Sequence, residues 1–295
     1  MDAVAADSLK HFVETEWLRD HLADPGLIVI DCSWHFPDEG DAWEEFQEEH
    51  IPGALFLDID VVSDTTNPLP HMLPSPQDFA RIVGEMGISN DDTIVVYDTY
   101  GFFCAAARVW WMFRIMGHDK VKVLNGGMPK WLDEDLPVEE GPPAKRPPRE
   151  FQVSFDASQV YSTDQILQIS RSGGAQLLDA RSPQRFTGEL GEPRPCQRLG
   201  HIPGSINVYF KDFIEYDGAL KPMAEVKKLL DASPVDLSRP IVTTCGSGVT
   251  AAVMNLIFTE IGVSGTAMYD GSWSAWGCED SGLPVATGPE PGGDA

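Results

Sequence analysis

The sequence has little positive charge. It contains 21 Lys and Arg residues against 46 Asp and Glu residues, which gives a formal net charge of −25. An acidic surface repels nucleic-acid phosphates and anionic lipid, so we expect neither as a partner. The chain also lacks any apolar run close to the roughly 20 residues that a membrane helix needs. An anionic small substrate would therefore require a local cluster of basic side chains.

Cysteine is scarce and its spacing is uninformative for metal or disulfide chemistry. The five cysteines are widely separated and include no Cys-x-x-Cys pair; they are Cys32, Cys104, Cys196, Cys245 and Cys278. This excludes a disulfide framework and a cysteine-based zinc site, and we predict no metal and no organic cofactor. Residues 1–7 lack the basic segment and apolar core of a signal peptide, and they are acidic where transit peptides are not. We therefore expect a cytoplasmic protein.

The two halves of the chain carry the same landmarks in the same order. They are apolar segments that end in Asp at 27–31 and 176–179, His-Ile-Pro-Gly at 50–53 and 201–204, apolar runs at 93–97 and 240–244, and a glycine turn followed by Trp at 125–131 and 270–276. Such a repeated order predicts a duplicated domain. A chain of 295 residues is long enough for two domains.

Each half alternates short apolar runs with helical patterns. In the first half, a helix is expected at 76–86, a strand at 94–97 and a helix at 105–116. This alternation predicts an α/β fold in which each domain is a parallel sheet flanked by helices. The Pro-rich composition of residues 137–150 predicts a stiff linker. We accordingly expect domains at 8–136 and 151–287 and a flexible tail at 288–295.

The segment that follows the apolar run 240–244 is the main candidate for chemistry. It reads Cys245-Gly246-Ser247-Gly248 and leads into a helix expected to begin near Ala251. Backbone N–H groups of such a loop and the helix end would favour a thiolate at Cys245, because both carry partial positive charge. The first half has Asp98 at the corresponding position, so we expect only the second domain to be catalytic.

These motifs together resemble the two-domain rhodanese-like sulfurtransferases, over residues 17–284. The loop is similar to that of the 3-mercaptopyruvate sulfurtransferase branch, because thiosulfate sulfurtransferases typically have basic residues where Gly246 and Ser247 stand. The resemblance implies that Cys245 takes the sulfane sulfur of 3-mercaptopyruvate as a persulfide and that pyruvate is released. A small thiol, cyanide or a thioredoxin-like protein then accepts the sulfur. The resemblance implies no metal and no organic cofactor, and we expect a monomeric or weakly associating protein.

The resemblance also implies a serine–histidine–aspartate set beside the nucleophile. The matching residues here are Ser247, His71 and Asp60, where a histidine can relay a proton and a carboxylate can fix its tautomer. From the residues alone, structural roles for Ser247 and His71 also remain as alternatives. Ser247 would also serve as a helix N-cap, and His71 beside Met72 and Leu73 would also suit a structural histidine.

Basic residues near 179–194 are candidates for the substrate carboxylate. The planar guanidinium groups of Arg185 and Arg194 match the substrate-binding arginines of the resembling family, whereas Arg181 is expected to pair with Asp179. Backbone groups of the loop are expected to contact substrate and to stabilise charge on the transferring sulfur, at Gly246, Gly248, Val249 and Thr250. His50 and His201 recur in both halves, so we expect them to serve the fold.

Three alternatives remain from the sequence. A thiosulfate:cyanide sulfurtransferase is disfavoured by the non-basic loop. A cysteine phosphatase is strongly disfavoured, because its phosphate loop carries an arginine where Ala251 stands. A non-catalytic rhodanese-like binding module is the third. We also hypothesise that Cys104 or Cys196 can form an inhibitory sulfur–sulfur bond with Cys245.

Overall fold

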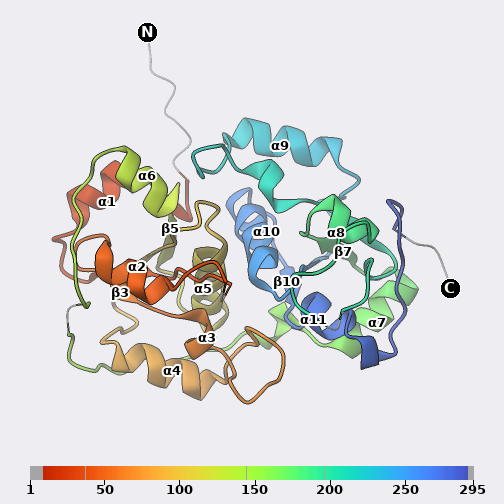
Figure 1. Cartoon of the computed structure of the whole chain (residues 1–295), viewed down its shortest axis with the longest axis horizontal. Coiled ribbons are helices and arrows are strands. Elements are labelled where there is room, and N and C mark those ends of the chain that lie inside the picture. Colours follow the sequence, from red (N-terminus) through yellow and green to blue (C-terminus); the bar gives the residue numbers. More distant parts are fainter. Residues whose placement is uncertain (1–8, 37, 144, 196, 292–295) are drawn as a thin grey trace, which may run out of the picture.

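The chain forms two five-stranded parallel sheets with the same strand order (Figure 1). The computed structural model describes residues 9–36, 38–143, 145–195 and 197–291. The first sheet has the order β1-β5-β4-β2-β3, with β1 Phe12–Val13, β2 Leu27–Asp31, β3 Leu55–Phe56, β4 Thr93–Tyr97 and β5 Val121–Leu124. The second has the order β6-β10-β9-β7-β8, with β6 Val160–Tyr161, β7 Gln176–Asp179, β8 Ser205–Asn207, β9 Ile241–Thr244 and β10 Thr266–Tyr269. The predicted α/β class with two parallel sheets is confirmed.

Helices cover both sheets. The first half contains α1 Thr15–His21, α2 Ala42–Glu48, α3 Ile59–Val62, α4 Pro76–Glu85, α5 Cys104–Ile115 and α6 Gly127–Asp133. The second half contains α7 Thr163–Ser172, α8 Pro183–Thr187, α9 Met223–Ala232, α10 Val249–Glu260 and α11 Ser272–Trp276, with 3-10 turns η1 Ala157–Gln159, η2 Phe210–Phe213 and η3 Glu279–Ser281. The helices expected at 76–86 and 105–116 are α4 and α5, within one residue. Helix α10 begins two residues before Ala251. No described helix is long and apolar enough to cross a membrane.

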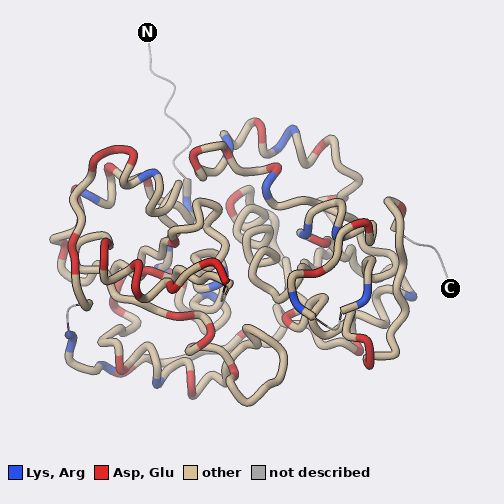
Figure 2. Tube along the Cα trace, in the orientation of Figure 1, with Lys and Arg blue, Asp and Glu red and all other residues tan. Residues whose placement is uncertain are grey.

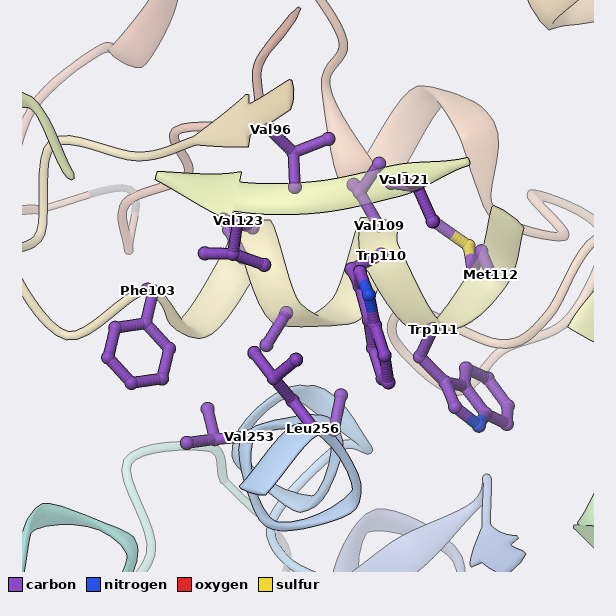
Figure 3. Close-up of a cluster of buried hydrophobic side chains, with 14 of the residues drawn as sticks. Val96, Phe103, Val109, Trp110, Trp111, Met112, Val121, Val123, Val253 and Leu256 are labelled. Carbon is purple, nitrogen blue, oxygen red and sulfur yellow. The ribbon is translucent and has the colours of Figure 1, made fainter. Parts of the chain in front are cut away.

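The largest hydrophobic core runs through both domains. Helices α5 and α10 pack against each other between the sheets, as the close-up shows with α10 seen end-on below α5 (Figure 3). Val109 and Trp110 of α5 and Val253 and Leu256 of α10 are each at most 1% exposed. Because both helices are apolar around most of their circumference, they can be buried on all sides only by pairing. This pairing places the loops before the two helices next to each other.

The histidines of the two His-Ile-Pro-Gly segments serve the fold, as predicted. His50 stacks on the ring of Phe46 and its Nδ1 lies 2.7 Å from the Phe46 carbonyl oxygen. His201 repeats this arrangement with Phe186, at 2.9 Å. Both rings are buried on the face of their sheet away from α5 and α10.

The segment between the sheets is exposed but attached to the first domain. The Arg149 N–H donates to the Gly84 carbonyl at 2.9 Å, and Arg149 also pairs with Asp92 at 2.7 Å. The segment after 287 is attached as well, since the Gly288 N–H donates to Thr187 at 2.9 Å. Residues 292–295 of the expected tail lie outside the described residues.

Candidate active site

A cavity of about 330 Å³ lies where the loops of the two domains meet. Its second-domain wall includes Cys245 and the residues that follow it, and its first-domain wall includes His71, Trp34 and the loop after β4. The carboxyl ends of β4 and β9 therefore face a shared space, which is the usual place for a ligand in parallel α/β sheets.

Cys245 lies directly after β9 at the floor of this cavity and is 2% exposed. Gly248 ends the loop with φ +78°, a left-handed conformation that favours glycine, and it is the N-cap of α10. The N–H groups of Gly246, Ser247 and Gly248 make no hydrogen bond to another described residue. They therefore remain available to a bound anionic group, and their role in stabilising charge at the Cys245 sulfur stays a prediction.

Helix α11 holds the loop from behind. The Cys245 N–H donates to Ser272 Oγ at 3.2 Å, and the Cys245 carbonyl accepts from the Trp273 N–H at 2.9 Å. The Gly246 carbonyl accepts from both the N–H and the hydroxyl of Ser274, each at 2.8 Å. Sequence reasoning placed the 270–276 segment in the repeat but did not identify its serines as partners of the loop backbone. Its small hydroxyl residues next to a glycine were the available signal.

The structure brings Ser247, His71 and Asp60 together. Ser247 Oγ lies 3.1 Å from His71 Nδ1, and His71 Nε2 lies 3.1 Å from Asp60 Oδ1. Asp60 is in α3 and also accepts a hydrogen bond from Trp34 Nε1 at 2.7 Å. Ser247 does not cap α10 with its side chain. The three residues therefore form a chain from the Cys245 loop to the first domain.

The protonation of this chain follows from its surroundings. Burial lowers the pKa of the His71 imidazole, and Asp60 only partly opposes this effect. The adjacent His71 side chain lowers the pKa of the Asp60 carboxyl. A neutral imidazole beside a carboxylate carries its proton on Nε2, so Nδ1 is left to accept the hydrogen bond from the Ser247 hydroxyl.

A buried arginine holds the His71 segment in place. Arg108 of α5 donates from Nη2 to the His71 carbonyl at 2.5 Å and lies 2.7 Å from Asp270 Oδ1. The other Asp270 oxygen accepts from the Leu73 N–H at 2.8 Å. His71 itself has φ +58°, which an L-residue with a bulky side chain rarely adopts. Arg108 and Asp270 therefore fix a strained turn across the domain boundary, and sequence reasoning missed both.

The two predicted substrate arginines lie in the cavity with different partners. Arg194 Nη1 lies 3.4 Å from Ser247 Oγ, and its guanidinium lies over Phe36 at 5.3 Å. Arg185 pairs with Glu192. A Cβ on Gly246 would come within 2.9 Å of Arg185 Nη2, so this guanidinium lies directly against the loop.

Arg181 is structural, as predicted. Its guanidinium pairs with Asp179 at 2.6 Å and with Glu192 at 2.6 Å, and it lies over the Trp273 ring at 4.4 Å. The side chain is fully buried, so these partners offset the cost of removing its charge from water.

The corresponding loop of the first domain contains its own anion. Asp98, directly after β4, is 0% exposed and accepts a hydrogen bond from the Ala106 N–H at 3.1 Å. Burial raises the pKa of this carboxyl to about 6. The carboxylate therefore occupies the position that Cys245 has in the second domain, and the first-domain loop offers no nucleophile there.

The cavity is a basic spot on an acidic molecule. Acidic residues outnumber basic ones along most of the trace (Figure 2). The cavity lining nevertheless includes four cationic residues, Arg181, Arg185, Arg194 and Lys211. Arg181 is fully buried and paired, and Glu39 and Asp98 also line the cavity. Arg185, Arg194 and Lys211 are therefore the cations left to hold an anionic substrate. Among the described residues, no group of three or more His, Cys, Asp or Glu is placed to hold a metal ion.

Cys104 lies on the cavity wall at the start of α5, and burial raises the pKa of its thiol. The four described cysteines are all free thiols. Cys196 lies outside the described residues, and its pairing with Cys245 stays a hypothesis, as does that of Cys104.

Comparison with known proteins places this site in a family. The family model of the rhodanese-like domain matches the chain twice, over residues 14–134 and 162–278. The 3-mercaptopyruvate sulfurtransferase of Escherichia coli strain K12 is 41% identical over 276 residues, which are 93% of this chain and 97% of that protein. A thiosulfate sulfurtransferase of Cricetulus griseus is 43% identical over 271 residues, which are 90% and 91% of the two chains.

The fold agrees with these relatives. The crystal structure of SseA from Escherichia coli superposes with a TM-score of 0.81 at 39% sequence identity, over 89% of this chain and 98% of that one. Relatives named for two different sulfur donors are thus similarly close, so overall identity does not choose between the donors.

Proposed function

The chain belongs to the rhodanese-like family, and we propose that it is a 3-mercaptopyruvate sulfurtransferase that works through a persulfide on Cys245. The observation that carries the proposal is the contact between Ser247, on the Cys245 loop, and His71. Where a thiosulfate sulfurtransferase typically has basic side chains, this loop has a glycine and a hydroxyl joined to a neutral histidine. That arrangement suits a donor that must exchange a proton.

The proposed first half-reaction balances without a cofactor. The Cys245 thiolate attacks the sulfur of 3-mercaptopyruvate, and the carbon–sulfur bond breaks with its electron pair going to carbon. The proton lost by the substrate thiol returns to that carbon, which gives pyruvate. In this proposal the Ser247 hydroxyl and neutral His71 take up and return this proton, and Asp60 orients the imidazole; the distances between the three side chains support these roles.

We assign the remaining site residues by their position in the cavity. Arg194 and Arg185 hold the carboxylate and carbonyl of the donor. The loop residues Gly246, Gly248, Val249 and Thr250 contact the substrate, and their N–H groups stabilise charge on the transferring sulfur. The acceptor is a small thiol, cyanide or a thioredoxin-like protein.

The division of the chain is part of the proposal. We assign a non-catalytic domain to 8–136, a linker to 137–150, a catalytic domain to 151–287 and a tail to 288–295, as tandem copies of one domain in a monomer. The equal strand order of the two sheets supports the tandem arrangement. Four free described thiols are consistent with the cytoplasm, which stays a prediction.

The test measures pyruvate release and intact mass after the reduced protein is mixed with 3-mercaptopyruvate. The expected result is one added sulfur atom and one pyruvate per chain. Both are expected to vanish in Cys245→Ser and to persist in Cys278→Ser, whose thiol is free and does not line the cavity.

Thiosulfate is the second donor to examine, since relatives named for it are 43% and 42% identical to this chain. A persulfide formed from thiosulfate but not from 3-mercaptopyruvate would reverse the assignment of donor. No mass gain from either donor would leave the non-catalytic binding module as the surviving alternative.

A further inference from the structure

One basic side chain in the cavity has no part in the proposed donor chemistry. Lys211 is in η2, which follows β8 and thus lies at the same sheet edge as Cys245. Its Nζ lies 3.8 Å from the centre of the Phe102 ring, which belongs to the first-domain loop after β4. A cation–π contact of this kind holds the ammonium at the domain boundary without neutralising its charge.

Lys211 and Arg194 are the two cavity cations that have no ion-pair partner among the described residues. Arg181 and Arg185 both pair with Glu192. Among the residues that the structure describes, no carboxylate lies within ion-pair distance of Lys211. The side chain is half-buried on the wall of a cavity in a molecule of net charge −25.

The cavity thus presents two cations with different surroundings. Arg194 contacts Ser247 and lies over Phe36, whereas Lys211 lies over Phe102, in a cavity whose lining also includes Tyr100 and Tyr209. The three-carbon donor has one carboxylate, which the proposed function assigns to the arginines. Lys211 is therefore left for an anionic group of another molecule that enters the same cavity.

We propose that Lys211 binds the anionic group of the sulfur acceptor and so makes the protein prefer acceptor thiols that carry a carboxylate. The proposal rests on the proposed function, because it concerns the second half-reaction. The acceptor thiolate attacks the outer sulfur of the Cys245 persulfide, the sulfur–sulfur bond breaks, and its electron pair stays on Cys245 as a thiolate. The product is the acceptor persulfide, with no net oxidant or reductant.

The physical reason is electrostatic. An anionic thiol approaching this acidic molecule is repelled until it reaches a local positive charge. The ammonium supplies that charge in the cavity that also holds Cys245, and the charge-assisted hydrogen bond that it can donate is stronger than a neutral one. A neutral thiol gains nothing from it. Lys211 is therefore expected to affect KM for anionic acceptors and not the formation of the Cys245 persulfide.

The experiment compares 3-mercaptopropionate, which has a carboxylate, with 2-mercaptoethanol, which has none, both at saturating 3-mercaptopyruvate. The variants are Lys211→Met, Lys211→Arg and the control Lys228→Met, which removes the same charge from the exposed face of α9. In Lys211→Met, we expect KM for 3-mercaptopropionate to rise about tenfold, with KM for 2-mercaptoethanol unchanged. Lys211→Arg and Lys228→Met should behave like the unmodified protein.

A rapid-mixing measurement of the pyruvate burst separates the two half-reactions. An unchanged burst in Lys211→Met is expected. A weaker pyruvate burst with 3-mercaptopyruvate, or slower sulfite release with thiosulfate, would assign Lys211 to the donor. Equal changes in KM for both thiols, or no change for either, would also overturn the proposal. The proposal would also be overturned if Lys228→Met raised KM for 3-mercaptopropionate as much as Lys211→Met does. Failure of the proposed function looks different: the unmodified protein then gives no burst, and the acceptor proposal falls with it.

Discussion

The buried ion pair between the domains gives the most quantitative prediction. The side chains of Arg108 and Asp270 are 1% and 5% exposed and their closest atoms are 2.7 Å apart. Replacing Arg108 by Met leaves the Asp270 charge buried without its partner and removes the donor to the His71 carbonyl. Breaking a pair in this way typically costs about 3–5 kcal/mol of unfolding free energy. We expect Arg108→Met to lose that amount.

A double-mutant cycle in urea, followed by circular dichroism, tests the reasoning. Asp270→Asn keeps the shape of the side chain and removes its charge. The double variant buries no unpaired charge, so its loss should be smaller than the sum of the two single losses by about 2 kcal/mol. Additivity of the two losses would refute the account. The control is Arg114→Met, whose partner Asp119 is 79% exposed, and it should cost no more than about 1 kcal/mol.

Three further predictions concern the site. Because burial lowers the pKa of His71 from 6.5, pyruvate release should lose activity only below pH 6.5, where the imidazole gains a proton; a decline that begins at higher pH would contradict a neutral His71. The pKa of the buried Asp98 carboxyl is raised from 3.8 to about 6, so the folded protein binds this proton more tightly than the unfolded chain does. Deprotonation of Asp98 therefore lowers the free energy of unfolding as the pH rises through this range. Between pH 3 and pH 7, the free energy of unfolding of Asp98→Asn should rise by about 3 kcal/mol relative to that of the unmodified protein, as measured by chemical unfolding. A difference between the two proteins that does not change with pH would argue against the raised pKa of Asp98. Gly246→Ala places a methyl group 2.9 Å from Arg185 Nη2 and should raise KM for the donor several-fold in steady-state kinetics, whereas Gly191→Ala, with open space around it, should leave KM unchanged.

The sequence predicted the framework well because its signals are local. Continuous apolar runs such as 93–97 and 240–244 are typical of strands buried on both faces, and both are central strands here. The loop at Cys245 follows from its glycines and the helix after it. In contrast, 176 positions separate Ser247 from His71, and no periodicity connects them. Their proximity could be expected only from the family resemblance.

The missed residues share a physical reason. Arg108 lies in a helix whose neighbours are apolar on every side, and a buried arginine requires a carboxylate partner. The sequence thus contained the need for a partner, but Asp270 lies in the other domain and was one acidic residue among 46. The attachment of the 137–150 segment was also hidden, because its backbone hydrogen bonds depend on the surface of a domain already folded.

The packing of α5 against α10 makes the second domain depend on the first. If the first domain were lost, Val253 and Leu256 would face water, and the second domain would become prone to aggregation. It would also lose His71 and Asp60, since both come from the discarded half. The second domain therefore needs the first domain both to bury α10 and to complete the candidate site.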